Sequence, residues 1–307
     1  MIFKNKWVAR LLALAVALAL LPGVLIVAYG VVARYHHAQQ TLTKAQLQQS
    51  HEAAVRWMTD HEGAVLEDPN SALWYMVREA ATITGDQRLN SLVQRYLEIW
   101  FPADRYQHGW RNAFAPASQE PVDLEQLASA QKYQQFLMYS VTCDPRLLSW
   151  PSVQEHLGSG ACPITVLSAL KESACSSHQL MGLNWLKERK CQPPGIDLQK
   201  SIDQTRADVR QLLWLDFRVR DVYLQRALTL WSGGYRQDVS SDVLSRIVGA
   251  QLPDGGWGDQ HVMLDRPFYL AMGGRKGLTT SPGDSDFHAT AQGLLLTALA
   301  VRDWGQP

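Results

Sequence analysis

The sequence predicts an all-α fold in which helical hairpins follow one N-terminal transmembrane helix. Three observations predict it: a long uncharged apolar run near the N-terminus, repeated helix-length apolar patterns separated by Gly, Pro and Asp, and the absence of sustained strand-like alternation. Removing the apolar run leaves roughly 270 residues, enough for one large domain with a substantial core.

Composition excludes some partners and some structural classes. Lys plus Arg and Asp plus Glu both number 29, and no basic tract interrupts the body of the chain, so we expect no nucleic-acid partner. The hydrophobic content of 46% excludes general disorder. The 11 tryptophans therefore indicate an aromatic core rather than stacking platforms.

The first forty residues contain a candidate membrane anchor. Between Leu11 and Ala33 lie 23 residues without a charge, enough for a helix that crosses the ~30 Å hydrocarbon layer. The alternative is a cleavable signal peptide, because Val31-Val32-Ala33 resembles a small-residue cleavage site; the apolar region, however, exceeds the ~7–15 residues usual in such signals. We therefore predict an uncleaved anchor at residues 11–33, after a short cytoplasmic segment at residues 1–10.

Two features predict that the body lies outside the cytoplasm. Lys4, Lys6 and Arg10 precede the apolar run, whereas Arg34 follows it, so the positive-inside rule places the N-terminus in the cytoplasm. An even set of cysteines suits disulfides in an oxidising compartment, with three possible connectivities. These residues are Cys143, Cys162, Cys175 and Cys191. We expect a single-pass protein of the inner membrane with a periplasmic C-terminal domain.

Two parts are expected after the anchor: a polar helical stalk at residues 34–70 and a helical domain at residues 71–307. In the domain, residues 71–84 and 88–101 predict a hairpin around Gly85-Asp86. Further helices are expected at residues 124–139, 163–173, 178–189, 202–215, 219–231, 240–252 and 288–301.

The most informative motif, residues 251–259, reads Gln-Leu-Pro-Asp-Gly-Gly-Trp-Gly-Asp and follows a predicted helix. Its proline stops that helix, and its glycines permit positive φ or a close backbone approach. The stretch resembles the Gln-x-x-x-Gly-x-Trp repeat ends of α/α-toroid proteins such as triterpene cyclases and prenyltransferase β subunits. The resemblance implies that Gln251 and Trp257 tie successive helices together, and that the hairpins are arranged around a centre.

Residues 284–293, which read Asp-Ser-Asp-Phe-His-Ala-Thr-Ala-Gln-Gly, resemble the Asp/His-x-Thr-Ala start of the inner helix in those toroids. Asp286 is a good N-cap for this helix. The resemblance extends from Asp238 to Asp303. The Asp-x-Asp-Asp acid of the cyclases and the zinc ligands of the prenyltransferases are not matched, so we carry over neither activity and predict neither a metal nor a cofactor.

The segment Cys175-Ser176-Ser177-His178 allows two alternatives to a disulfide. A thiolate and an imidazole on one helical face, with His288 as a third ligand, would form an open zinc site. The same thiol and imidazole would form a nucleophile pair. Three other cysteines are available as disulfide partners, so a disulfide is the preferred interpretation for Cys175.

Acidic and aromatic side chains gather in the last third of the chain. If loops converge over a central cavity, two acids there can act together as in glycoside hydrolysis, where one donates a proton and the other is base or nucleophile. Each Asp also sits where an N-cap or turn would place it. The predicted catalytic set is His288, Asp286, Asp284, Asp254 and Asp259, and the predicted substrate-binding set is Trp257, Tyr235 and Arg218.

Arg218, Asp221 and Gln225 are spaced to share one helical face. An Arg–Asp pair on a solvated surface explains the spacing, and such a pair stabilises by only ~0.2–0.5 kcal/mol. If the face lines the cavity, the same residues could grip an anionic substrate.

Two functions follow from these patterns. The first is a membrane-anchored periplasmic domain that binds or processes a cell-envelope carbohydrate, because a ring of hairpins forms a cavity and the loops are acidic and aromatic. The alternative is a non-catalytic scaffold that contacts other membrane proteins, because no complete catalytic constellation is present. Fold alone does not choose between them.

Overall fold

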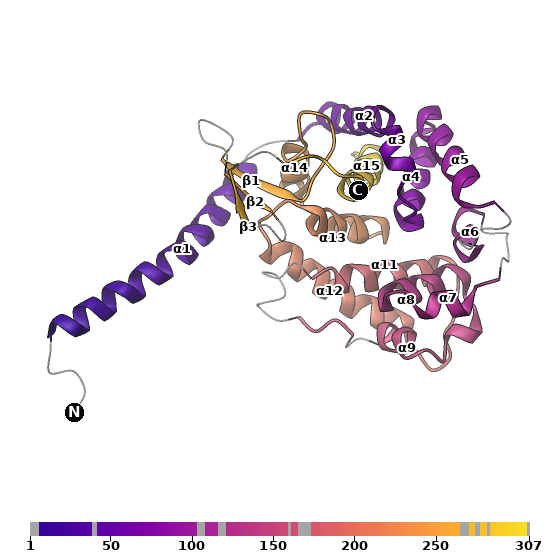
Figure 1. Cartoon of the computed structure of the whole chain (residues 1–307), viewed down its shortest axis with the longest axis horizontal. Helices are drawn as coiled ribbons and strands as arrows, with labels where there is room; N and C mark the ends of the chain where they lie inside the picture. Colours follow the sequence, from indigo (N-terminus) through magenta and orange to yellow (C-terminus); the bar gives the residue numbers. More distant parts are fainter. Residues whose placement is uncertain are drawn as a thin grey trace.

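The computed structural model defines residues 6–38, 42–102, 108–115, 121–158, 161–164, 173–264, 270–273, 277–280 and 283–305. The described chain is mostly helical (Figure 1). The helices of the first half are α1 (Lys6–Ala38), α2 (Lys44–Asp60), α3 (Glu62–Leu66), α4 (Ser71–Thr84), α5 (Gln87–Trp100), α6 (His108–Phe114), α7 (Leu124–Ala128), α8 (Lys132–Thr142), η1 (Pro145–Leu147) and α9 (Pro151–Leu157). Those of the second half are α11 (Cys175–Glu188), α12 (Leu198–Leu215), α13 (Asp221–Ser232), η2 (Arg236–Asp238), α14 (Ser241–Gly249) and α15 (Phe287–Arg302).

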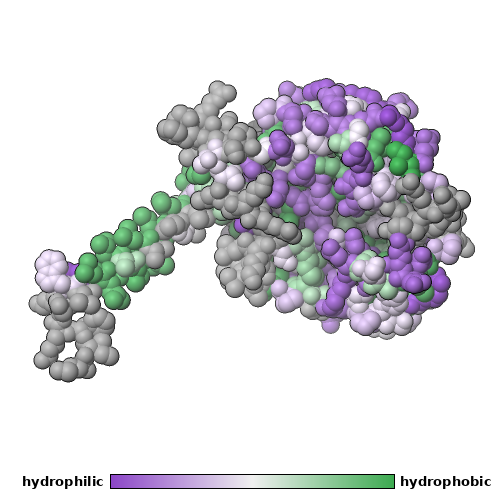
Figure 2. All heavy atoms as spheres, in the orientation of Figure 1, coloured by the Kyte–Doolittle hydropathy of each residue, from purple (hydrophilic) through white to green (hydrophobic). Residues whose placement is uncertain are grey.

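Helix α1 projects from the body, and its apolar side chains are exposed (Figures 1 and 2). The segment Arg10–Val32 is long and apolar enough to cross a membrane, and its mean hydropathy is 2.8. The most apolar stretch of this segment is not buried against the body. The apolar run expected at residues 11–33 therefore forms a helix of membrane-spanning length. On the face shown in Figure 2, the coloured residues of the body are mainly hydrophilic.

The expected hairpin of α4 and α5 is confirmed. Asn70 caps α4 by accepting a hydrogen bond from the backbone N–H of Ala72 at 3.2 Å. Gly85 ends the helix with a φ of 70°, a conformation that glycine adopts at little cost. Asp86 then caps α5 by accepting from the N–H of Arg88 at 2.8 Å.

The expected stalk at residues 34–70 is wrong beyond residue 43. Helix α2 packs on α5, α14 and α15, and it buries Leu47, Ala54, Val55, Trp57 and Met58. The sequence of α2 is polar overall, so its apolar stripe was not recognised. Such a stripe needs apolar residues on only about a third of the helix surface. The helical domain consequently begins near Lys44 rather than at Ser71.

Six helices of the body contact one another in a closed cycle. Helix α4 packs on α15, α15 on α13, α13 on α11, α11 on α8, α8 on α6, and α6 on α4. Other helices cover this cycle from outside: α5 lies on α4, α2 on α15, α12 on α11 and α13, and α9 on α8 (Figure 1). A second layer of helices therefore surrounds the first over most of the ring.

Helix α15 is buried on every side. All residues from Ala289 to Ala300 are buried, between α4, α13 and α2. Small side chains and leucines dominate it, so neighbouring helices can approach from several directions. The N-terminus of α15 is capped by Asp286, whose carboxylate accepts from the N–H of Ala289 at 2.8 Å, as the sequence predicts.

The turn after α14 joins α2, α14 and α15. Gln251 Nε2 donates to the carbonyl oxygens of Ser50, at 2.8 Å, and Gly255, at 2.7 Å. Trp257 is 1% exposed, and its Nε1 donates to the carbonyl oxygen of Ile247 at 2.8 Å. Both side chains thus tie helices together.

A small sheet follows this turn, which the sequence did not predict. Strands β1 (Gln260–Leu264), β2 (Leu270–Gly273) and β3 (Gly277–Thr279) pair antiparallel in that order, with Gln260 opposite Gly273 and Ala271 opposite Thr279. Strands of three to five residues are too short for alternation to stand out. The sheet lies beside the body end of α1, outside the cycle of helices (Figure 1).

Some expected helices differ from those observed. Residues 124–139 form two helices, α7 and α8, with a break at residues 129–131. The expected helix at residues 163–173 falls mostly outside the described residues.

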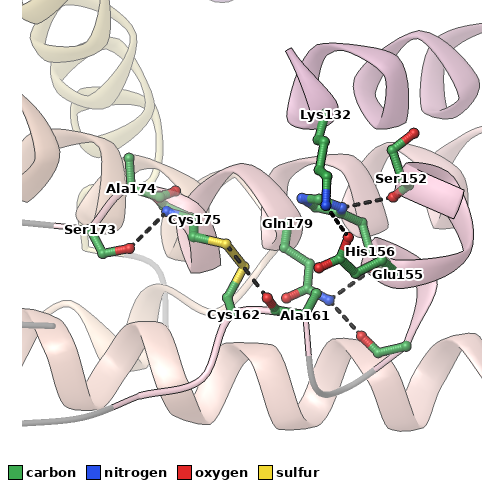
Figure 3. The surroundings of a disulfide bond; sticks show 12 residues. Lys132, Ser152, Glu155, His156, Ala161, Cys162, Ser173, Ala174, Cys175 and Gln179 are labelled. Carbon is green, nitrogen blue, oxygen red and sulfur yellow. Dashed lines mark hydrogen bonds and ion pairs between the residues drawn. A yellow bond between two sulfur atoms is a disulfide. The ribbon is translucent and has the colours of Figure 1, made fainter.

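All four cysteines are paired. Cys143 at the end of α8 bonds Cys191 after α11, and Cys162 bonds Cys175 at the start of α11 (Figure 3). Both bridges tie helix α11 to the segment before it. Spacing alone allowed three connectivities, and the tertiary structure selects this one.

We expect the longer bridge to stabilise the domain more. The Cys143–Cys191 bridge spans 48 residues and the Cys162–Cys175 bridge spans 13. By the loop-closure relation, replacing each pair with serines should lower the free energy of unfolding by about 4 and about 3 kcal/mol respectively. Urea unfolding of the two double variants tests this, and a larger loss for the shorter bridge would contradict it.

Gly293 allows Trp257 to pack against α15. A Cβ added at Gly293 would lie 2.5 Å from the indole ring, so Gly293→Ala should cost about 1–3 kcal/mol of stability through overpacking. Gly63→Ala is the matched control, because a Cβ there meets no atom within 4 Å and alanine is the better helix former. Equal melting temperatures for both variants would contradict this packing.

Candidate functional site

The cycle of helices surrounds a cavity of about 410 Å³. Helices α4, α6, α7, α8, α11, α13 and α15 all contribute side chains to it. Its aromatic and imidazole side chains are Trp110, Tyr133, His178 and His288. Its amide side chains are Asn70, Gln126, Gln134, Gln225 and Gln292. Among the described residues that line it there is no lysine or arginine.

A second cavity, of about 510 Å³, lies inside the same cycle. Helices α4, α11, α13 and α15 line it as well, and it shares Met76 and Met181 with the first cavity. These two methionines therefore stand between the cavities. Both histidines, His178 and His288, line the first cavity.

His288 is the central polar residue of the first cavity. Its Nδ1 lies 2.5 Å from Oδ1 of Asp221, at the start of α13. Gln292, one turn further along α15, donates from Nε2 to the same carboxylate oxygen at 3.0 Å. Because Asp221 engages Nδ1, Nε2 is the ring nitrogen that can exchange a proton with a ligand.

The surroundings of His288 raise its pKa above the ordinary value of 6.5. Burial opposes this by lowering the pKa, but the hydrogen bond to Asp221 and the negative charges of Asp221 and Asp286 outweigh burial. The His288–Asp221 pair accordingly makes the imidazolium form more stable than it is in an isolated histidine. Burial raises the pKa of Asp286, the N-cap.

The pKa of His178 shifts in the opposite direction to that of His288. Its ring stacks on Tyr133, with centroids 4.1 Å apart and planes inclined by 9°. Burial, aided by the nearby His288, lowers the pKa of His178 to about 4. The cavity therefore combines a neutral imidazole on α11 with a readily protonated one on α15.

Two of the amide side chains that line the cavity are buried. Gln225, which is 2% exposed, lines the cavity, and its Oε1 lies 2.9 Å from the hydroxyl oxygen of Ser177. Gln292 is fully buried, and no donor among the described residues reaches its Oε1. A buried acceptor without a donor costs about 1–3 kcal/mol.

Of the predicted catalytic residues, the structure places His288 on the cavity, with Asp286 capping the same helix. The other three aspartates are exposed and lie outside the cavity lining. Asp254 accepts hydrogen bonds from Trp57 Nε1, at 3.2 Å, and from the N–H of Gly256, at 3.1 Å.

Oδ1 of Asp259 lies 3.7 Å from a terminal guanidinium nitrogen of Arg220. Asp284 is in the loop before α15. These aspartates have the turn and surface positions that their local sequence also allows. The structure does not bring them together as an acid pair over the cavity.

The predicted substrate-binding residues lie elsewhere. Trp257 is buried in the core. The ring of Tyr235 is 9% exposed and lies beneath the guanidinium of Arg206, 4.3 Å away. Arg218 is 8% exposed and binds Asp216, with Nε 2.9 Å from Oδ1. All three side chains make contacts within the folded body, and none of them belongs to the lining of the cavity.

The disulfide excludes the thiol alternatives for Cys175 in this structure. Its sulfur is bonded to Cys162, so it is neither a thiolate ligand nor a nucleophile. Figure 3 shows His156 and Gln179 close to the bridge; the side chain of Gln179 donates to the carbonyl oxygen of His156 at 2.8 Å. These residues hold the segment before α11 in place.

Sequence reasoning missed most of the cavity lining. It noted Asp221 and Gln225 on one helical face, and both do reach the site, but Arg218 precedes the helix and turns into the core. The lining amides and His178 carried no distinguishing signal, because isolated Gln, Asn and His are common on any helix surface.

Comparisons with protein-family profiles, curated proteins and solved structures found no match.

We expect the pKa of His288 to depend on Asp221. Without the carboxylate, burial dominates, so Asp221→Asn should move the pKa of His288 from above 6.5 to below it. The wild-type pair stabilises the fold fully below the unfolded pKa, and this stability is lost as pH rises through the raised folded pKa. An NMR titration of the histidine ring protons measures the shift, with His261 as an internal reference, because its pKa of about 4 is set by burial and by charges other than Asp221. An unchanged titration in Asp221→Asn would contradict the assignment.

Proposed function

We propose that the protein is a single-pass inner-membrane protein whose periplasmic ring of helices, an α/α toroid, binds a neutral carbohydrate of the cell envelope. The observation that carries this proposal is a cavity lined by amides and aromatic rings, with the hydrogen-bonded cluster of His288, Asp221 and Gln292 beside it. The closed cycle of helix contacts supports the toroid.

The length of α1, the positive charges at its N-terminal end and the two disulfides support the proposed location. The segment Arg10–Val32 matches a bilayer in length, and the positive residues Lys4, Lys6 and Arg10 favour a cytoplasmic N-terminus. Two disulfides in the body suit an oxidising compartment. Membrane attachment through residues 11–33 would place the cavity among envelope components.

Carbohydrate is favoured because the cavity offers many neutral hydrogen-bonding groups. A sugar hydroxyl donates and accepts at once, so it can pair with the amide side chains that line the cavity. Trp110 and Tyr133 supply apolar ring surface for the C–H faces of a sugar. The absence of lysine and arginine from the described lining disfavours an anionic ligand, including the anionic substrate considered for Arg218.

If the protein also transforms its ligand, His288 is the group that would transfer the proton. Asp221 fixes its ring and supports the protonated form, which is the arrangement of a general acid–base histidine. Hydrolysis by two facing carboxylates is not favoured, because Asp254, Asp259 and Asp284 lie outside the cavity lining. We therefore propose binding as the function, with proton transfer at His288 as its chemical capacity.

Binding can be tested with the full-length protein in nanodiscs. The probes are neutral tetrasaccharides (β-1,4-glucose, α-1,4-glucose and β-1,4-N-acetylglucosamine), with a uronate tetrasaccharide as the anionic comparison, measured by calorimetry. We expect at least one neutral probe to bind more tightly than the uronate. Gln225→Ala should weaken that binding about tenfold, the equivalent of one net hydrogen bond.

The matched control is Gln87→Ala, the same chemical change on the exposed surface of α5. Melting curves of both variants show whether the fold is kept. Failure of every neutral probe, or equal weakening by both variants, would sink the carbohydrate proposal and favour the scaffold alternative.

A further inference from the structure

The body contacts the last turn of the proposed span directly. The ring of Tyr29 lies edge-on to Phe217, with centroids 6.1 Å apart, and to His261 on β1, 6.0 Å apart. Gly30 lies beneath the same phenylalanine, because a Cβ added there would be 3.0 Å from the Phe217 ring. Helix α1 also packs on α14.

The depth of this contact follows from helix geometry. Tyr29 lies three residues before the end of Arg10–Val32, about 5 Å along the helix axis. Trp7 lies near the other end of the span, 71% exposed, with the Arg10 guanidinium 6.0 Å from its ring. The 22 residues from Trp7 to Tyr29 cover about 33 Å, close to the thickness of the hydrocarbon layer. Aromatic residues at this separation mark the two interfaces of a bilayer.

Apolar side chains are exposed on the body beside this contact. Trp214 is 69% exposed and Leu215 is 37% exposed, at the C-terminal end of α12. They precede Phe217 by three and two residues, so their backbone lies within about 10 Å of the residue that touches α1. Trp214 is the most exposed large hydrophobic side chain described on the body; the others are Ile99, at 41%, and Trp304, at 39%.

We propose that the face formed by Trp214, Leu215 and Phe217 rests on the outer surface of the bilayer that α1 crosses, with the indole of Trp214 in the headgroup region. The inference rests on the proposed membrane span of α1. A lipid surface is the occupant because the exposed pair continues from a contact at interfacial depth. Tryptophan prefers this depth, where its ring is apolar and its N–H stays hydrated.

Two attachments then fix the ring of helices to the membrane, one through α1 and one through the end of α12. Because α1 is packed on the body, a tilt of α1 alone would tilt the body with it, whereas a second attachment restricts this motion. Helix α12 packs directly on α11 and α13, which carry His178 and Gln225 of the cavity. The membrane contact thereby sets the orientation of the cavity relative to the bilayer.

Depth-dependent fluorescence quenching tests the inference. Full-length protein is reconstituted in phosphatidylcholine vesicles whose acyl chains carry bromine near the headgroup end, and tryptophan emission is compared with that in unbrominated vesicles. We expect Trp214→Phe to lose one tryptophan's share of the quenched amplitude, while Trp7 remains quenched. Trp304→Phe, the matched control on the exposed body surface, should lower total emission without changing the quenched amplitude.

The outcomes separate this inference from the proposed span. If alkaline carbonate releases the protein from vesicles, α1 does not span, and both proposals fail. If the protein is retained but Trp214→Phe shows wild-type quenching, the span stands and the membrane-resting face is overturned. Absence of lipid quenching together with protection of Trp214 from acrylamide would identify a protein partner on this face, which also overturns the inference.

Discussion

The structure depends on the burial of α15 between three other helices. All residues of this helix from Ala289 to Ala300 are buried, with α2, α4 and α13 packed around it, and Gly293 lets the indole of Trp257 approach its backbone. The turn after α14 is thereby fixed to the start of α15. His288, in the first turn of α15, takes its position in the cavity from this packing rather than from local sequence.

The ionisable group in the first turn of α15 has partners from another helix. The structure brings Asp221 from α13 to His288 and Gln292 on α15, and the side chains of His288 and Asp221 stay partly exposed, at 41% and 24%. The deeper Asp216 is likewise held by Arg218 and Arg226. The cavity consequently contains polar groups while its described lining lacks lysine and arginine, and this balance underlies the proposal of a neutral ligand.

Much of the helical content could be predicted because it is encoded locally. Asn70, Gly85 and Asp86 set the ends of α4 and α5 through caps and a left-handed turn, and such signals act within a few residues. The stalk expectation was wrong because the face that α2 buries is narrow, and what covers it, α15, is more than two hundred residues away in the chain. The three-stranded sheet was missed because its strands are too short to show a period.

The sequence by itself determined an apolar helix of membrane-spanning length, the α4–α5 hairpin, the Asp286 cap and the choice of His288 as a polar residue of interest. Only the tertiary structure decided which cysteines pair, that Asp254, Asp259 and Asp284 stay apart from the cavity, and that Asp221 is the partner of His288. The physical reason is the distance along the chain over which each kind of interaction acts. Caps and apolar periodicity act over one or two helical turns, whereas His288 and Asp221 are 67 residues apart, and the packing of whole helices sets their distance.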